Sequence, residues 1–242
     1  MDKLYIIIPA YNEEENIETV AREWHEVARK ANEQSRIAII DDGSCDSTYA
    51  KLQQLQKELP QLEAITKPNG GHGSTILYGY RHALENGADY IFQTDSDGQT
   101  DADEFWQFWE LREQYDALIG HRKNRKDGIS RIFVAKTLKV TLLICFGLWT
   151  EDANTPFRLM NRDTLENLLP RIPKDYNLAN VLLTVLMEKA KVKIHYLKIT
   201  FRPRQGGVNY INMKRIFKIG KKAARDFISL RKAVKNDFKI KI

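Results

Sequence analysis

Three stretches of the sequence share one pattern: LYIIIPAYN (4–12), RIAIIDDGS (36–44) and DYIFQTDSD (89–97). Each begins with apolar and β-branched residues and ends in a polar turn. Continuous apolar runs of this length are typical of strands buried on both faces of a parallel sheet. We expect the first strand to end before Pro9, because proline cannot donate to a strand ladder. The three polar turns are then predicted to meet at the carboxyl edge of one sheet.

Helical segments separate these strands. Apolar residues at helical spacing between Ile17 and Ala28 predict a helix over 14–31, with Asn12 as its N-cap. In the first half we predict strands at 4–8, 36–40, 62–66, 89–94 and 117–119, and helices at 14–31, 47–58, from the turn at 69–73 to residue 85, and 101–113. Strands that alternate with helices at this spacing predict βαβ units, and so an α/β fold with a parallel sheet.

The second half of the chain is less regular. Its predicted elements are a basic loop at 120–130, a helix at 131–149, a loop and short strand at 152–159, a helix at 175–189, a strand at 191–201, a turn-rich loop at 202–209 and a basic amphipathic helix from 211 onward. We therefore expect a domain at 1–210, with halves at 1–120 and 121–210, followed by a C-terminal helix at 211–242.

Charge is distributed unevenly between the two halves. The 242 residues carry 38 Lys and Arg and 32 Asp and Glu, a net charge of +6. Residues 1–120 hold 10 basic and 23 acidic residues, whereas residues 121–242 hold 28 and 9. An acidic half suits a hard cation, and a basic half suits an anionic partner. Nucleic acid is not the expected partner, because the acidic half would repel phosphates and no helix-turn-helix pattern is present.

Composition and apolar patterning indicate where the protein works. A hydrophobic fraction of 43% is normal for a globular protein and excludes disorder. Cys45 and Cys145 are too few for a disulfide framework and are expected to be reduced thiols. The run at 6–8 is too short for a signal peptide, and the run at 138–149 is shorter than the roughly 20 residues of a bilayer span. We expect a cytoplasmic protein, peripheral on the inner face of the membrane.

The strongest chemical signal is the pair Asp95 and Asp97 directly after an apolar strand. Two carboxylates at this spacing in a turn can share one divalent cation, Mg²⁺ or Mn²⁺, which also keeps water or phosphate ligands. Gln99 could add a carbonyl oxygen. The alternative interpretation is a capped turn before the helix predicted at 101.

Two further turns are open to two interpretations. Asp41 and Asp42 either form an ordinary turn or accept hydrogen bonds from a nucleotide base or ribose. The run NGGHG at 69–73 could offer backbone N–H groups to an anion, but it matches no phosphate-loop pattern. By itself it is better explained as a turn and helix start.

Taken together, IIPAYNEEEN (7–16), IDDGSCDST (40–48) and DSD (95–97) resemble family-2 glycosyltransferases of the GT-A fold. The resemblance covers roughly residues 1–210. It implies a Rossmann-like mixed sheet, mostly parallel, with helices on both faces. It also implies a nucleotide-sugar donor, a divalent metal on the diphosphate and inversion at the anomeric carbon. Residues 1–120 would then form the nucleotide-sugar half and residues 121–210 the acceptor half.

The resemblance assigns roles to particular positions. It implies that Pro9, Tyr11 and Glu13 line the nucleotide and that Asp42, with Asp41 beside it, contacts the base or ribose. It also implies that Asp95 and Asp97 of the DSD turn contact the ribose, the metal and the diphosphate. The residues assigned in this way to the donor and metal are Pro9, Tyr11, Glu13, Asp41, Asp42, Asp95, Ser96, Asp97 and Gln99.

Within that family, the second half is most similar to dolichol-phosphate mannose synthase and bacterial polyprenyl-phosphate sugar synthases. That group has an Asp-x-Asp-x-Gln run, here DSDGQ at 95–99, and an Asp followed six residues later by Arg, here Asp152 and Arg158. Its basic loop corresponds to Phe201 through Arg204 and Gly207. The chain departs from the group by lacking His-Pro after Gln99 and by carrying Pro156 where the group has Gly. It also lacks the Gln-x-x-Arg-Trp run of processive synthases.

The resemblance and simple chemistry suggest how the acceptor reacts. Asp152, Arg158 and Arg204 are the catalytic candidates. A lipid phosphate is already anionic and needs only cationic positioning, for which Arg122, Arg131 and Arg204 are candidates. A hydroxyl acceptor would instead need a base, with Asp152 as first choice.

The C-terminal segment favours a membrane-bound acceptor. From Lys214 to the end there are 11 Lys and Arg and two Asp and Glu, and the apolar residues fall on one helical face. This pattern is typical of a helix on an anionic membrane surface. The run at 138–149 could be a second interfacial element. The alternative is that both helices pack on the domain or on a partner chain, and the sequence leaves open a homo-oligomer or a membrane-protein partner.

Three functions remain after these arguments. The leading one is transfer of a sugar from a UDP- or GDP-linked donor to polyprenyl or dolichyl phosphate at the membrane surface. The second is transfer to a hydroxyl of a lipid-linked or cell-surface saccharide. The third is a non-catalytic nucleotide-sugar-binding subunit, which the intact carboxylate pair disfavours.

Overall fold

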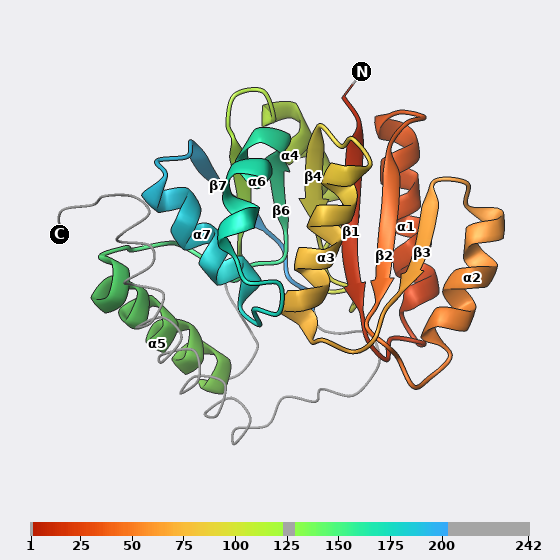
Figure 1. Cartoon of the computed structure of the whole chain (residues 1–242), viewed down its shortest axis with the longest axis horizontal. Helices are drawn as coiled ribbons and strands as arrows, with labels where there is room; N and C mark the ends of the chain where they lie inside the picture. The colour runs from red at the N-terminus through yellow and green to blue at the C-terminus, as the bar shows by residue number, and fades with distance from the viewer. Residues whose placement is uncertain (1, 123–128, 203–242) are drawn as a thin grey trace.

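The computed structural model describes residues 2–122 and 129–202, and only the backbone of residues 129–136. A seven-stranded sheet forms its centre, in the order β3-β2-β1-β4-β6-β5-β7 (Figure 1). The strands are β1 (Leu4–Ala10), β2 (Arg36–Asp41), β3 (Leu62–Thr66), β4 (Tyr90–Gln93), β5 (Ala117–Arg122), β6 (Arg158–Asn161) and β7 (Ile194–Ile199). Only β6 is antiparallel to its neighbours. The predicted α/β fold with a mostly parallel mixed sheet is confirmed.

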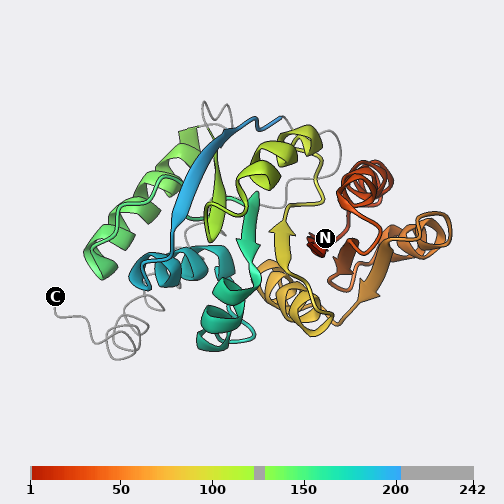
Figure 2. The ribbon, with the colours of Figure 1, turned by 90° about the horizontal axis from the view of Figure 1, so that it is seen from above.

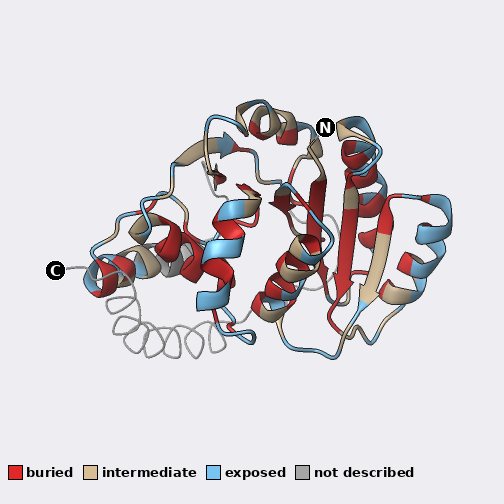
Figure 3. Cartoon of the chain, turned by 45° about the horizontal axis from the view of Figure 1, so that its top comes forward, coloured by how far each residue is buried: buried red, intermediate tan, exposed pale blue. Residues whose placement is uncertain are grey.

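Helices cover both faces of this sheet (Figure 2). They are α1 (Ile17–Ala31), α2 (Thr48–Glu58), α3 (His72–Glu85), α4 (Phe105–Leu111), α5 (Ile129–Phe146), α6 (Arg162–Leu168) and α7 (Ala179–Lys189), with short 3-10 turns at Ala102–Glu104 and Leu169–Arg171. Side chains alternate across β1: Ile6 and Ile8 pack beneath α1 and α2, whereas Tyr5 and Ile7 pack beneath α3. Figure 3 shows the buried strands between helices whose outer faces are exposed.

Helix α3 lies directly on β1. A Cβ atom at Gly79 would come within 2.3 Å of Ile7 Cγ2, so only glycine permits this approach. On the other face, Trp24 of α1 is buried and stacks on Phe92 of β4 at a centroid distance of 5.2 Å. Close packing on both faces holds the strand ends at fixed positions.

Strand β1 continues through Pro9 to Ala10, so the expectation that Pro9 ends it was wrong. The ladder between β1 and β4 ends at the pair Ile7 and Gln93. The carbonyl of Pro9 accepts a hydrogen bond from Ser96, which follows β4, so the missing N–H of Pro9 would have faced the β4 side. Proline is tolerated there because no ladder partner remains on that side.

The second half contains elements that the sequence patterns did not indicate. Residues 160–174, for which no element was expected, contain α6, whose N-cap Asn161 accepts a hydrogen bond from Thr164 N at 2.9 Å. Helix α7 begins at Ala179 rather than 175, and α1 begins at Ile17 with Asn16, not Asn12, as its N-cap. Strand β5 extends to Arg122 because it pairs with β7 along its whole length.

Helix α5 is apolar on more than one side. Its Leu142 and Phe146 are buried in the core beneath the sheet. In contrast, Ile144 and nearby Trp149 are 69% and 67% exposed, and Val140 and Leu143 are also exposed. No helix in the described ranges is long and apolar enough to cross a bilayer.

Candidate functional site

The polar turns after β1, β2 and β4 meet at one edge of the sheet, as the sequence predicted. Strand β1 lies between the other two and is parallel to both. Asp42 N donates to Ala10 O at 2.8 Å, and Ser96 Oγ donates to Pro9 O at 2.9 Å. The carboxyl ends of β1 and β2 point to the lower edge of Figure 1, where α3 begins. This carboxyl edge is the candidate site.

Asp95 has an unusual environment within this edge. Its Oδ1 atom is buried and has no hydrogen-bond partner within residues 2–122 and 129–202. The imidazole of His72 lies beside it, with Nε2 at 3.8 Å from Asp95 Oδ1. Nearly all buried polar atoms in proteins have a partner, so an unsatisfied carboxylate oxygen is a candidate for ligand binding.

Asp97 is held by its own turn, in which Oδ1 accepts a hydrogen bond from Gln99 N at 3.1 Å. Within residues 2–122 and 129–202, no three His, Cys, Asp or Glu side chains are grouped closely enough to form a metal site. Mg²⁺ and Mn²⁺ are commonly bound by one or two carboxylates together with substrate phosphates. The unsatisfied oxygen of Asp95 and the nearby carboxylate of Asp97 fit a cation of this kind.

Gln99 joins the DSD turn to the segment after β7. Its Nε2 donates to Arg202 O, and Arg202 N donates to Gln99 O, each at 2.8 Å. Arg202 also pairs with Asp101, and Thr200 N donates to both carboxylate oxygens of Glu104 at 2.9 Å. These bonds place the start of the 202–209 loop beside the DSD turn. The sequence predicted Gln99 only as a metal ligand and did not predict this structural contact.

Asp41 and Asp42 are both buried and both hydrogen-bonded within the protein. Asp41 accepts from Thr66 Oγ1 at 2.8 Å and from Ser44 N at 3.2 Å. Asp42 accepts from Gly70 N at 2.9 Å and Gly71 N at 2.8 Å, and it pairs with Lys67. The N–H groups of the 69–73 turn therefore bind a carboxylate of the protein itself.

The residues assigned to the nucleotide by resemblance lie around the same edge. Tyr11 is 43% exposed, so its ring is available for contact with a ligand. Pro9 is buried within β1. Glu13 is also buried, and its Oε2 accepts from Asn16 Nδ2 at 2.9 Å while its N donates to Thr48 Oγ1 at 2.8 Å. Glu13 thus stabilises the turn that leads into α1.

Arg122 and Asp152 form a two-bond ion pair. Nε of Arg122 lies 2.7 Å from Oδ2 of Asp152, and Nη2 lies 2.9 Å from Oδ1. Both side chains are largely buried, and the guanidinium also lies 5.2 Å from the ring centroid of Phe201. The neighbouring side chains of His121 and Glu151 also meet, with Nδ1 of His121 at 2.5 Å from Oε2 of Glu151. Both oxygens of Asp152 are therefore engaged by an arginine that had been expected to bind the acceptor.

Arg158, a predicted catalytic residue, lies in the interior of the protein. It is fully buried, and its guanidinium donates to the backbone carbonyls of Thr155 at 2.7 Å, Ala153 at 3.3 Å and Asn180 at 3.2 Å. Burial lowers the pKa of Arg158. The side chain ties the loop before β6 to α7, which indicates a structural role. The expected catalytic role stays a prediction.

Three expectations depend on residues outside the described structure. Arg204 and the predicted helix at 211–242 lie in the undescribed segment 203–242. Arg131 belongs to α5, but only its backbone is described. The sequence analysis did not predict that the side chains of His72, Lys67 and Arg202 belong to this edge. For His72, a signal was present in the sequence, because this histidine lies between two glycines at a predicted helix start.

The chain is similar in sequence to known proteins. Residues 5–173 match the family described as "Glycosyl transferase family 2". An undecaprenyl-phosphate 4-deoxy-4-formamido-L-arabinose transferase from Pseudomonas savastanoi pv. phaseolicola is 27% identical over 167 residues, covering 68% of this chain and 49% of the relative. The same-named protein of Photorhabdus laumondii is 27% identical over 170 residues, covering 69% and 51%. The chain spans about half the length of these curated relatives.

Solved structures with the same fold are GT-A glycosyltransferases. Glucosyl-3-phosphoglycerate synthase from Mycobacterium tuberculosis, solved with Mn²⁺ and UDP-glucose, has a TM-score of 0.65 and 16% identity over 94% of this chain and 78% of its own. S. aureus TarS 1-349 in complex with UDP-GlcNAc has a TM-score of 0.60 and 16% identity, covering 98% and 71%. At this identity the likeness establishes the fold, and the sequence match establishes the family. The chain has the GT-A fold and belongs to glycosyl transferase family 2.

Proposed function

We propose that this protein transfers a sugar, with inversion, from a UDP- or GDP-linked donor to a polyprenyl phosphate. The observation that carries the proposal is the Asp95 and Asp97 pair at the carboxyl end of β4, in a chain similar to undecaprenyl-phosphate sugar transferases. The M. tuberculosis neighbour was solved with Mn²⁺ and UDP-glucose, which supports a divalent cation and a nucleotide-sugar in this fold.

The donor is proposed to lie across the carboxyl edge. Tyr11 contacts the base with its exposed ring, and Asp42 lies at the end of the adjacent strand. Asp95 and Asp97 hold a Mg²⁺ or Mn²⁺ ion, which neutralises charge on the leaving diphosphate. Ser96 fixes the turn through its bond to Pro9, so both carboxylates are positioned before the donor binds.

The engaged state of Asp152 favours a phosphate acceptor. A hydroxyl acceptor needs a base that removes its proton, but both oxygens of Asp152 are occupied by Arg122. A lipid phosphate is already an anion near neutral pH and needs only to be positioned. We propose that Arg204 provides this positioning, because the 99–202 hydrogen bonds bring the start of its loop beside the DSD turn.

We also propose that the protein binds the membrane surface peripherally. The exposed apolar residues on and after α5 offer an apolar contact, and the segment 121–242 supplies the positive charge that an anionic bilayer attracts. Co-sedimentation with vesicles of anionic lipid tests this part separately. Binding that is unchanged by Ile144→Ser and Trp149→Ser would refute a role for α5.

The test of the activity uses nucleotide-sugars, Mn²⁺ or Mg²⁺, and polyprenyl phosphate in detergent. The expected product is a lipid-linked sugar that can be extracted into chloroform. The nucleotide-sugar that yields this product is identified as the donor. Asp95→Asn should abolish the product, whereas Asp103→Asn, an exposed carboxylate nearby, is the matched control and should not. Transfer to a saccharide hydroxyl but not to the lipid phosphate would overturn the proposed acceptor. Donor binding without any transfer would indicate a non-catalytic subunit.

A further inference from the structure

We propose that His72 is a protein ligand of the divalent cation beside Asp95, and that it makes the site select Mn²⁺ over Mg²⁺. The inference rests on the proposed function, because it concerns the cation that the donor diphosphate requires. His72 is the first residue of α3, whereas the DSD turn follows β4. The two meet because α3 begins at the same edge where β4 ends.

The first argument is the distance between the two groups. His72 Nε2 and Asp95 Oδ1 are 3.8 Å apart, which is too far for a hydrogen bond. A divalent ion binds nitrogen and oxygen ligands at about 2.0 to 2.2 Å, so two ligands of one ion lie roughly 3 to 4.3 Å apart. The observed separation of these two atoms therefore lies within the range for two ligands of one ion.

The second argument is that this oxygen of Asp95 is otherwise unsatisfied. It is buried and accepts no hydrogen bond from any described residue, although burial of a charged group without a partner is costly. The side chain of His72 is 55% exposed, so its imidazole borders both Asp95 and solvent. An ion between them would complete the carboxylate. Asp97, water and the diphosphate would take the remaining positions when the donor binds, because in the described structure the three side chains are not grouped closely enough to hold an ion by themselves.

The third argument is that the position of His72 is held by its neighbours. Gly71 has a φ of 87°, a conformation that favours glycine. A Cβ atom at Gly73 would come within 2.2 Å of Tyr176 O, so the first turn of α3 packs directly on the backbone before α7. Gly71 O also accepts from Thr75 N at 3.1 Å. His72 is thus presented to Asp95 by a first turn with little freedom.

The chemistry of the ligand predicts selectivity. Mg²⁺ is a hard ion that prefers oxygen ligands and retains water, whereas imidazole nitrogen suits transition-metal ions better. A nitrogen ligand should therefore add affinity for Mn²⁺ and contribute little to Mg²⁺ binding. A water molecule could also span 3.8 Å between the two groups, and the experiment separates the two cases.

The experiment measures ion binding directly in the full-length protein with UDP present. Free Mn²⁺ is counted by electron paramagnetic resonance, and Mg²⁺ is measured by competition. Because removing even an outer partner of a metal site typically costs 10- to 100-fold in affinity, His72→Asn should weaken Mn²⁺ binding by at least about tenfold. The same variant should change Mg²⁺ binding by less than about threefold. Pulsed resonance should show nitrogen coupling in the wild type that His72→Asn removes.

His82→Asn is the matched control, because His82 lies on the same helix and also pairs with a carboxylate, Glu63, but at the opposite edge. It should leave Mn²⁺ binding and the nitrogen coupling unchanged. Equal weakening of both ions by His72→Asn, or unchanged Mn²⁺ binding, would overturn the role of His72 as a ligand. If the wild type with UDP bound neither ion, the proposed cation site itself would be wrong, an outcome distinct from failure of His72 alone.

Discussion

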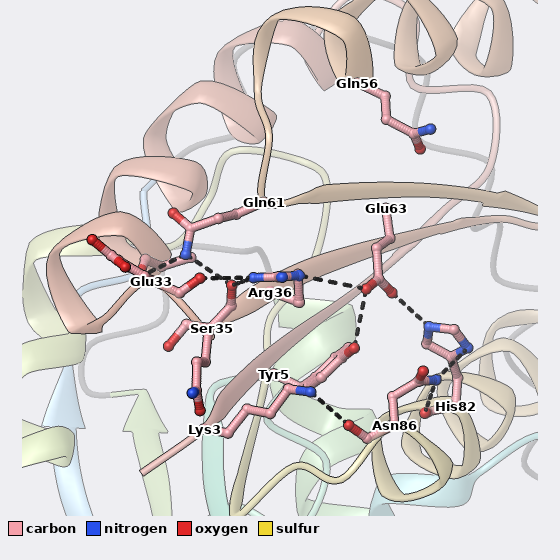
Figure 4. A network of polar contacts seen from close by, with 12 residues as sticks. Lys3, Tyr5, Glu33, Ser35, Arg36, Gln56, Gln61, Glu63, His82 and Asn86 are labelled. Atoms are coloured by element: carbon pink, nitrogen blue, oxygen red, sulfur yellow. Dashed lines mark hydrogen bonds and ion pairs between the residues drawn. The ribbon is translucent and has the colours of Figure 1, made fainter. Parts of the chain in front are cut away.

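The two edges of the same sheet treat their charged groups differently. At the amino edge, Glu63 of β3 accepts from Tyr5 OH at 3.0 Å and pairs with His82 at 2.6 Å, and Arg36 lies 4.0 Å away (Figure 4). At the carboxyl edge, one oxygen of Asp95 has no hydrogen-bond partner among the described residues and only the more distant His72 beside it. The first arrangement stabilises the fold, whereas the second keeps a carboxylate available for a ligand at some cost in stability.

The largest expected effect on activity comes from a substitution at the carboxyl edge. Asp95→Asn should reduce sugar transfer by about a thousandfold or more, because it removes a charge that holds the cation at the leaving diphosphate. The melting temperature should stay within a few degrees of the wild-type value, since the buried oxygen of Asp95 makes no described hydrogen bond that the variant would lose. A large fall in melting temperature together with the loss of activity would show that Asp95 is structural and would remove this contrast.

Arg158 provides the opposite test, because it lies at the start of β6 but is fully satisfied. Arg158→Met should lower the free energy of unfolding by about 3 kcal/mol, since it leaves several buried backbone carbonyls without donors. Urea denaturation measures this loss. Arg22→Met, which removes two exposed ion pairs, with Glu18 and Glu58, is the control and should have no measurable effect. Wild-type stability in Arg158→Met would contradict the structural role.

A variant of Asp152 tests whether this carboxylate, which is paired with Arg122, takes part in the reaction. With a lipid phosphate acceptor, Asp152→Asn should keep kcat within about tenfold of the wild type, because no proton needs to be removed. A general base contributes typically 10²- to 10⁴-fold. A loss in that range, with the apparent KM for the acceptor unchanged, would make Asp152 a base and favour a hydroxyl acceptor.

The smallest expected effect is at the amino edge. Burial raises the pKa of Glu63, but hydrogen bonds from His82 and Tyr5 and the charges of His82 and Arg36 outweigh it, so the net shift is downward. A lowered folded-state pKa adds stability that is present above the unfolded value of about 4.3 and is lost as pH falls through the folded pKa.

Glu63→Gln should therefore destabilise the protein by about 1 kcal/mol at pH 7, and the difference from wild type should shrink below about pH 4. Urea unfolding at several pH values measures it. Glu26→Gln, at an exposed pair with Arg29, serves as the control. A difference between Glu63→Gln and wild type that persisted at pH 3 would mean that packing, not charge, accounts for the contribution of Glu63.

Strands with continuous apolar sequences were predictable because their burial depends mainly on their own composition. Strand β3 has the predicted bounds, β1 and β2 are longer than predicted by two residues and one residue at their C-terminal ends, and β4 is one residue shorter at each end. Strand β6 was less predictable, because its antiparallel placement between β4 and β5 depends on contacts distant in sequence. The same reason explains Arg158, whose partner carbonyl at Asn180 is 22 residues away.

The sequence by itself determined the fold class, the family and the carboxyl edge at which the polar turns meet, because these depend on local patterns and on the rule that parallel strands end together. Only the tertiary structure decided which of those polar groups are already satisfied. The pairs Arg122 with Asp152, Gln99 with Arg202 and His72 with Asp95 each join segments that are distant in sequence. A residue's chemical role depends on its partner, and packing of the whole chain selects that partner.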